Sequence, residues 1–226
     1  MRIWTTVEEA RRHRQQARGR VALVPTMGAL HEGHLRLMGE GRRLADTVFV
    51  SIFVNPTQFG PGEDLDHYPR TLEEDLRLCE AAQVAGVFTP SVQEMYPPQV
   101  IDAAVDVPDL TSDLEGAWRP GHFNGVCRVV LKLLNIFQPE LAMFGEKDYQ
   151  QLRVVQAMVA DLMLPTRIVP VPTVRESDGL AMSSRNRYLD EPQRRKAVGL
   201  YKALKQAQRM VEEDQETDPL AVERAM

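Results

Sequence analysis

Two histidines, His31 and His34, follow an apolar run and a glycine-containing turn in the stretch VALVPTMGALHEGHLRL, residues 21–37. This pattern predicts a strand, a loop and the start of a helix. A helix begins with unpaired backbone N–H groups and a partial positive charge, which attract phosphate. If the helix has begun by His31, both imidazoles project from nearly the same face and can reach one anion. Gly33 removes a side chain where a base or a phosphate chain would approach the backbone.

A P-loop is the nearest competing interpretation, because Gly28 and Gly33 have the glycine spacing of G-x-x-x-x-G-K-[ST]. His34 and Leu35 stand where that loop needs Lys and then Ser or Thr, which excludes a P-loop NTPase. The H-x-G-H spelling instead resembles the signature of the nucleotidyl transferases, in which paired histidines hold ATP for attack at its α-phosphate. On these four residues alone, two partly exposed loop histidines near a helix cap are an equal alternative.

The composition is that of an ordinary globular protein, with 226 residues, 43% apolar and 26% charged. No apolar run is long enough to span a membrane, and the N-terminus carries charges where a signal peptide is apolar. We therefore expect a cytoplasmic protein with no membrane partner. The net charge of −5 gives no indication of a nucleic-acid partner. Cys79 and Cys127 lack metal-like spacing and are expected to be buried thiols, so no protein metal site is predicted.

Strand and helix patterns alternate along most of the chain. Strands are predicted over residues 21–25, 47–54, 87–88, 141–144 and 167–174. Helices are predicted over residues 7–17, from the H-x-G-H motif to about residue 44, in the segment that follows Thr71, and over residues 125–138 and 149–163. Residues 91–121 are expected to be irregular, with a possible edge strand at 105–107. Thr71 and Glu74 have capping-box spacing, and Leu72, Leu76 and Cys79 share one helix face. The alternation predicts an α/β fold with a Rossmann-like, doubly wound parallel sheet.

The character of the chain changes after Val174, where the polar stretch RESDGLAMSSRNRYLDEP leads into a helix predicted from about 192 to 213. Asp190 and Gln193 have the spacing of its capping box. We therefore expect two domains, residues 1–173 and a small, apparently truncated second domain, 174–226.

Polar groups follow each predicted strand, and ligands of open α/β sheets bind beyond the carboxyl ends of the strands. Lys147, Arg185, two serine hydroxyls and the two histidines can carry a polyphosphate, while Gln58 and Gln151 can bind a small polar substrate. Each of these residues, taken singly, also has a structural interpretation. The glutamines could be ordinary polar residues of exposed loops, Lys147 and Asp148 could form a surface ion pair, and Ser183, Ser184 and Arg185 could form a helix-capping loop.

Six stretches together closely resemble the pantothenate synthetase family, the pantoate–β-alanine ligases. They are PTMGALHEGH, SIFVNPTQF, YPRT, LEG followed by RPGHFNGV, FGEKDYQQL and DGLAMSSRNRYL, in family order over residues 21–189. The resemblance implies that pantoate attacks the α-phosphorus of ATP to give pantoyl adenylate and pyrophosphate, and that β-alanine then displaces AMP to give pantothenate. It also implies Mg2+ bound through the ATP phosphates and a homodimer.

The resemblance further implies the site residues. His34 would be the proton donor, with His31 and Lys147 as the other catalytic groups. Gln58 and Gln151 would hold pantoate, Gln58 would also touch β-alanine, and Asn55 would support that pocket. The residues implied to bind ATP are Met27, Gly28, Ala29, Leu30, His31, Glu32, Gly33, His34, Gly145, Glu146, Lys147, Asp148, Val174, Met182, Ser183, Ser184 and Arg185.

Family members usually continue well past the helix that is predicted to end near residue 213, and so complete a second domain that folds over the active site as a lid and protects the adenylate from water. The alternative to a ligase is therefore a nucleotide-binding fragment of the same family, without full turnover. Two other rivals are weaker. A cytidylyltransferase would have no use for the paired glutamines, and a tRNA synthetase core should carry a basic surface and an anticodon-binding domain.

Overall fold

The computed structural model describes residues 1–226, which form two compact units, Met1–Pro172 (unit 1) and Thr173–Met226 (unit 2). Unit 1 contains a six-stranded sheet in the order β1-β4-β3-β2-β5-β6, and every neighbouring pair is parallel. The strands are β1 (Arg2–Trp4), β2 (Val21–Thr26), β3 (Thr47–Ile52), β4 (Gly86–Phe88), β5 (Leu141–Gly145) and β6 (Arg167–Val171). The predicted doubly wound α/β fold is confirmed.

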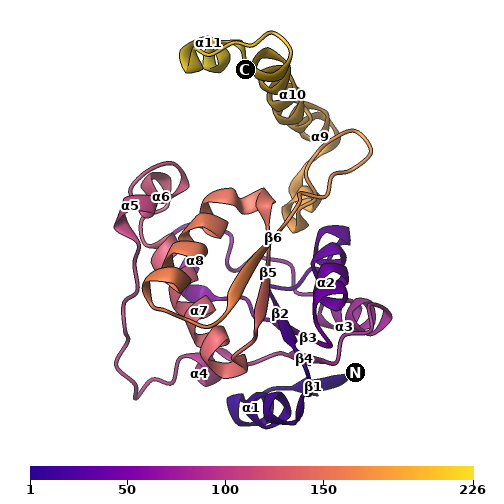
Figure 1. The fold of residues 1–226 in the computed structure, drawn as a ribbon, viewed down its shortest axis with the longest axis vertical. Helices are drawn as coiled ribbons and strands as arrows, with labels where there is room; N and C mark the ends of the chain where they lie inside the picture. The colour runs from indigo at the N-terminus through magenta and orange to yellow at the C-terminus, as the bar shows by residue number, and fades with distance from the viewer. The chain divides into compact units, whose positions relative to one another are not determined.

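Helices cover both faces of this sheet (Figure 1). On one side lie α2 (Glu32–Leu44) and α3 (Leu72–Ala81), and on the other α1 (Val7–Gln16), α7 (His122–Phe137) and α8 (Tyr149–Asp161). Alternate residues of each central strand enter different cores, because side chains of a strand point to opposite faces. Leu23 and Phe49 pack with α7, whereas Val24 and Val50 pack with α2. Burial on both faces explains why these strands read as continuous apolar runs.

The segment between β4 and α7 forms three short helices, α4 (Val92–Met95), α5 (Pro108–Thr111) and α6 (Glu115–Trp118). The edge strand expected at residues 105–107 does not form, and that prediction was wrong. The outer strand beyond β4 is instead β1, which pairs in parallel with β4 through Arg2, Ile3 and Trp4. Three residues are too few to show a periodic pattern, so the sequence did not indicate this strand.

The start of α3 also differs from the prediction. Thr71 precedes the helix with ψ of 45°, and its side chain makes no capping hydrogen bond. The hydroxyl donates instead to Asp75 Oδ1 at 3.2 Å. Leu72 is 45% exposed, so the buried face of α3 contains Asp75 and Cys79 rather than Leu72.

Unit 2 begins with a loop that closes on itself through an antiparallel bridge between Arg175 and Ala181. It continues through η3 (Ser184–Tyr188), α9 (Glu191–Ala197), α10 (Gly199–Glu212) and α11 (Pro219–Ala225). The predicted capping box of Asp190 and Gln193 is present. The single helix expected from 192 to 213 is divided at Val198 into α9 and α10.

No helix of the chain is both long enough and apolar enough to cross a membrane. Both cysteines are free and buried, as predicted. Burial raises the pKa of Cys79 to about 12 and that of Cys127 to about 11, so both remain protonated thiols at pH 7.

Candidate active site

Three loops of unit 1 meet where the strand order reverses. β2 lies between β3 and β5, with the strands that follow it placed first on one side and then on the other. The carboxyl edge at such a reversal is where open α/β sheets bind ligands. The structure therefore brings the predicted residues 27–34, 55–58 and 145–148 to one edge, since they follow β2, β3 and β5.

The loop after β2 turns sharply through two left-handed residues, Gly28 with φ of +83° and Ala29 with φ of +49°. Glycine adopts this conformation without strain, whereas alanine does not, so the turn needs support. Part of it is local: Gly28 N–H donates to Thr26 Oγ1 at 3.2 Å, and the Thr26 hydroxyl donates to Ser51 O at 2.7 Å.

Asp75 of α3 supplies the rest of that support. Its carboxylate accepts the N–H groups of Ala29 at 3.0 Å and Leu30 at 2.8 Å, and Asp75 itself is only 1% exposed. Sequence reasoning missed this residue, which holds the loop after β2, the predicted nucleotide loop, in place. A signal was present, because Asp75 stands four residues before the buried Cys79 and is a charged residue on an apolar helix face.

His31 and His34 cap α2 reciprocally. His31 is the N-cap, its Nδ1 accepts Gly33 N–H at 3.1 Å, and His34 Nδ1 accepts His31 N–H at 3.2 Å. The ring centroids lie 4.2 Å apart. A neutral imidazole whose Nδ1 accepts carries its proton on Nε2. The caps therefore fix the tautomer of each neutral ring, which leaves Nε2–H as its remaining donor.

Burial lowers the pKa of His34 to about 3, and the electrostatic effects of His31 and Lys147 are smaller causes. The His34 ring is therefore neutral at pH 7. The family resemblance implies that His34 is a proton donor. A neutral imidazole donates a hydrogen bond rather than releasing a proton, so this structure favours the role of a hydrogen-bond donor for His34.

The backbone groups at the start of α2 are largely occupied by the protein itself. Gly33 N–H is bound by the His31 ring, and His34 N–H donates to His31 O at 2.8 Å. Two of the N–H groups expected to form a bare anion site are thus already hydrogen-bonded within the protein. A Cβ on Gly33 would lie 2.8 Å from His31 Cε1, so this glycine makes room for the histidine ring, while the close approach of a base or phosphate inferred from the sequence stays a prediction.

Lys147 lies in η2 (Glu146–Asp148), directly after Gly145 ends β5. Its Nζ is 3.0 Å from Asp148 Oδ1, and both side chains are partly exposed. Such a pair contributes little stability, so the ammonium group can exchange Asp148 for a stronger anion at small cost. The lysine charge also contributes to the lowered pKa of His34, which places it in the electrostatic surroundings of the histidine pair.

The two glutamines that follow η2 have different surroundings. Gln150 is tied to the segment before α7, since its Nε2 donates to Leu110 O at 2.8 Å and Asp113 O at 2.9 Å. Gln151, in the first turn of α8, is half-buried, and its amide makes no hydrogen bond within the protein. Of this pair, Gln151 is the residue whose amide is available to a ligand.

Asn55 and Gln58 form a buried pair at the end of β3, with exposures of 1% and 8%. Asn55 Nδ2 donates to Gln58 Oε1 at 3.0 Å, and Gln58 Nε2 contacts Met27 Sδ at 3.2 Å. The predicted substrate residues thus touch the predicted ATP loop. A Cβ on Gly125 would lie 2.1 Å from Thr57 O, so this glycine permits α7 to pack against η1 (Pro56–Gln58).

The remaining predicted residues belong to unit 2. Met182 N–H donates to Val174 O at 3.0 Å, and Ser183 Oγ accepts Arg185 N–H at 3.2 Å. Ser184 is buried. The Ser183 contact is the helix-capping arrangement considered as an alternative from sequence, and a hydroxyl that accepts in this way retains its own proton for donation.

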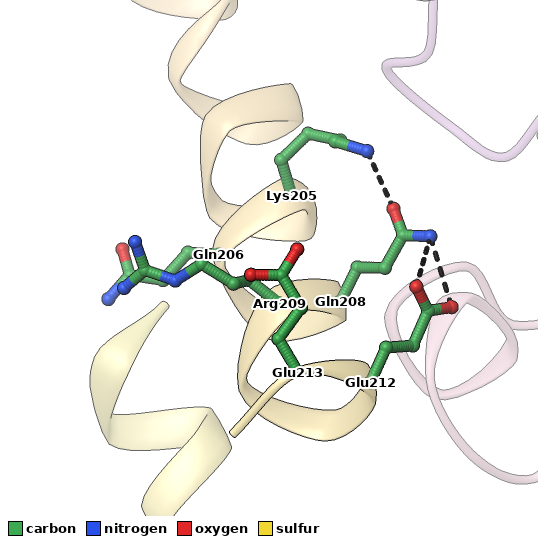
Figure 2. Close-up of a pocket in the computed structure, with 6 residues that line it drawn as sticks. All are labelled: Lys205, Gln206, Gln208, Arg209, Glu212 and Glu213. Carbon is green, nitrogen blue, oxygen red and sulfur yellow. Dashed lines mark hydrogen bonds between the residues drawn. The ribbon is translucent and has the colours of Figure 1, made fainter. Parts of the chain in front are cut away.

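A pocket in unit 2 lies along α10 and contains none of the predicted site residues (Figure 2). Within it, Gln208 accepts from Lys205 and donates to Glu212. It is lined by Lys205, Gln206, Gln208, Arg209, Glu212 and Glu213. These long polar chains form an open surface groove without an apolar or catalytic group.

Comparison with known proteins decides the family. The family model described as pantoate-beta-alanine ligase matches residues 2–225. The chain belongs to the pantoate–β-alanine ligase family. Among curated members, the pantothenate synthetase of Myxococcus xanthus is 56% identical over 202 residues, covering 89% of this chain and 69% of its own length. That of Rhizobium johnstonii is 52% identical over 227 residues, covering 99% of this chain and 74% of its own length.

Solved structures of pantoate–β-alanine ligases share the fold over the whole chain. A pantothenate synthetase from Thermus thermophilus has a TM-score of 0.94 at 50% identity, and this chain covers 80% of it. A pantoate–β-alanine ligase from Francisella tularensis, solved in complex with β-γ ATP and β-alanine, has a TM-score of 0.87 at 35% identity. This chain covers 86% of the Francisella protein.

Proposed function

We propose that the carboxyl edge of the unit 1 sheet is where this chain activates pantoate with ATP. The chain is an ATP-dependent pantoate–β-alanine ligase, which forms pantothenate through a pantoyl adenylate and releases AMP and pyrophosphate. The observation that carries the site proposal is the reciprocal cap of His31 and His34, which places two imidazole rings together at a helix start beside the point of strand reversal.

The first step is an in-line displacement at the α-phosphorus, and negative charge grows on the phosphoryl oxygens as pyrophosphate leaves. Donors and cations fixed in advance stabilise such charge without reorganisation. In the proposal, His34, His31 and Lys147 are these groups. Their ring tautomers and the weak Lys147–Asp148 pair support this role, because all three end in N–H donors.

The remaining nucleotide contacts are proposed from the loops on which they stand. The turn at Gly28 and Ala29, held by Asp75, offers a fixed backbone surface to ATP. The proposed contacts of unit 1 beyond the catalytic groups are Met27, Gly28, Ala29, Leu30, Glu32, Gly33, Gly145, Glu146 and Asp148. Unit 2 would contribute the Val174 backbone to the adenine, and Met182, Ser183, Ser184 and Arg185 to the phosphates.

Pantoate and β-alanine are proposed to bind beside the nucleotide loop. Gln58 and Gln151 would hold pantoate, with Gln58 also touching β-alanine and Asn55 supporting the pocket. Two observations support the assignment: Gln58 contacts Met27 of the nucleotide loop, and the Gln151 amide makes no hydrogen bond within the protein. A carboxylate bound there would lie next to the predicted position of the phosphates.

Mg2+ is proposed to enter with ATP, bound through its phosphates, because this ion prefers oxygen ligands and commonly binds through substrate phosphates. Its chemistry would be to neutralise phosphate charge. A cytoplasmic location and a homodimer also stay predictions, to be tested by cell fractionation and by sedimentation of the purified chain.

The direct test measures AMP, pyrophosphate and pantothenate from the purified chain with ATP, Mg2+ and pantoate, with and without β-alanine. We expect AMP in proportion to pantothenate when all substrates are present. Pyrophosphate without pantothenate would show activation without the second step. ATP binding with no turnover would overturn the proposed ligase site for this chain.

A further inference from the structure

Asn55 is held by three donors that converge on its side-chain oxygen. Oδ1 accepts the Tyr96 hydroxyl at 2.8 Å, the Thr57 hydroxyl at 2.9 Å and Thr57 N–H at 3.3 Å. The amide nitrogen lies on the opposite side, where Nδ2 donates to Gly125 O at 3.1 Å and to Gln58 Oε1 at 3.0 Å.

These partners determine the orientation of the Asn55 amide. A backbone N–H such as that of Thr57 can only donate, and a backbone carbonyl such as that of Gly125 can only accept. A flipped Asn55 would set its NH2 group against a donor and its oxygen against an acceptor. Because Asn55 is buried, unpaired polar atoms there cannot turn to water instead.

The orientation of the Asn55 amide determines that of the Gln58 amide. Since Asn55 presents an N–H, the oxygen of Gln58 must face it, and the NH2 group of Gln58 is turned to the other side. Its protein contact there is the Met27 sulfur at 3.2 Å, a weak acceptor. The donor end of Gln58 therefore retains hydrogen-bonding capacity.

We propose that Tyr96 and Thr57 are positioning residues which, through Asn55, fix Gln58 as a hydrogen-bond donor toward an oxygen of bound pantoate. This inference rests on the proposed function, in which Gln58 contacts pantoate. Tyr96 lies 41 positions from Asn55 in the chain and directly follows α4. The segment between β4 and α7 thereby acts on a substrate contact at the end of β3.

Two cationic side chains of α7 lie over the Tyr96 ring and help to fix its position. The guanidinium of Arg128 lies 4.5 Å from the ring centroid and the Lys132 ammonium 5.1 Å, both from α7. Cations over an aromatic face are attracted by its negative charge density. Burial raises the pKa of Tyr96, against the opposing effects of Thr57 and Arg128, so the phenol keeps the proton that it donates to Asn55.

The test is a double-mutant cycle of Tyr96→Phe and Gln58→Ala, with kcat/KM for pantoate measured at saturating ATP. Tyr96→Phe keeps the ring and removes one hydrogen bond, so we expect a threefold to tenfold loss, on the order of one neutral hydrogen bond. The loss should lie in KM for pantoate, with kcat and KM for ATP nearly unchanged. In the Gln58→Ala background, Tyr96→Phe should cause no further loss.

Two further variants separate positioning from folding. Thr57→Val removes the other hydroxyl donor and should repeat the KM effect, whereas Tyr201→Phe, a matched control in unit 2, should not. Thermal unfolding of each variant reports structural damage. Equal loss from Tyr96→Phe in both Gln58 backgrounds, or no loss in either, would overturn the positioning role. An unchanged KM for pantoate in Gln58→Ala alone would overturn the proposed substrate contact and, with it, this inference.

Discussion

Asp75→Asn is the most direct test of how the nucleotide loop is held. Asparagine has nearly the same shape but no charge, and one of its two terminal atoms is an NH2 group. Asp75 now accepts from Ala29 N–H at 3.0 Å and Leu30 N–H at 2.8 Å in a fully buried position. In the variant, the asparagine oxygen can accept one of the two backbone N–H groups as a neutral hydrogen bond. The other backbone N–H then faces the asparagine NH2 group, which is also a donor.

The expected cost follows from these two contacts. A hydrogen bond to a charged group contributes about 1.5 to 3 kcal/mol, and a neutral one about 1 kcal/mol. Losing one and weakening the other amounts to about 2 to 4 kcal/mol. If the loop is displaced in the variant, binding of ATP must supply the lost free energy to return it to its position, and kcat/KM for ATP should fall by about 30-fold to 1,000-fold. If the loop stays in place, the same free energy should lower the melting temperature by about 4 to 16 °C.

The assay is pantoate-dependent exchange of pyrophosphate into ATP, with thermal unfolding measured on the same samples. Glu74→Gln is the matched control, because it removes the same charge from an exposed neighbour in the same helix turn. An Asp75→Asn variant that matches Glu74→Gln in both measurements would refute the clamp.

Three other outcomes are expected. His34→Ala and Lys147→Ala should each lower kcat by about two to three decades, as for loss of one transition-state donor, and near-normal turnover in the exchange assay would reject the role. The pKa of His34 falls from 6.5 to about 3 on folding, so the unfolded chain binds more protons between these values. The free energy of unfolding should therefore fall as pH drops through that window, and less so in His34→Gln, when urea unfolding is compared at about pH 7 and about pH 4.5. Gly125→Ala would place a Cβ 2.1 Å from Thr57 O, so a destabilisation of about 1 to 3 kcal/mol is expected in the same unfolding assay, with a raised KM for pantoate.

The elements that the sequence predicted well are those set by local pattern. Residues 47–54 read as a strand because burial on both faces requires a continuous apolar run, and the structure has β3 there. Asp190 caps α9, as its spacing to Gln193 predicted, and Thr6 and Glu9 form the same arrangement at α1 in the structure. In each case the partners lie within one helical turn, so the sequence contains the whole interaction.

The elements that it missed depend on partners far along the chain. Thr71 and Glu74 have the spacing of a capping box, but Thr71 bonds instead to Asp75, whose other partners are 45 and 46 residues away. Tyr96 reaches Asn55 across 41 residues. Spacing cannot show such contacts, because the fold and not the local chain brings the groups together. A charged residue on an apolar helix face was the only sign that Asp75 had a buried partner.

A common arrangement links these buried contacts to the chemistry. The backbone N–H groups of the nucleotide loop are taken up by Thr26, Asp75 and the histidine rings, so few remain for a ligand. In the proposed function, the groups that meet the substrates are instead side-chain donors: the rings of His31 and His34, the Lys147 ammonium and the Gln58 amide. Their partners in the reaction are a carboxylate and phosphoryl oxygens that gain negative charge. Because N–H donors of the protein orient the histidines and the glutamine, most of the reorganisation is complete before the substrates bind, which is the condition under which hydrogen-bond donors accelerate a displacement.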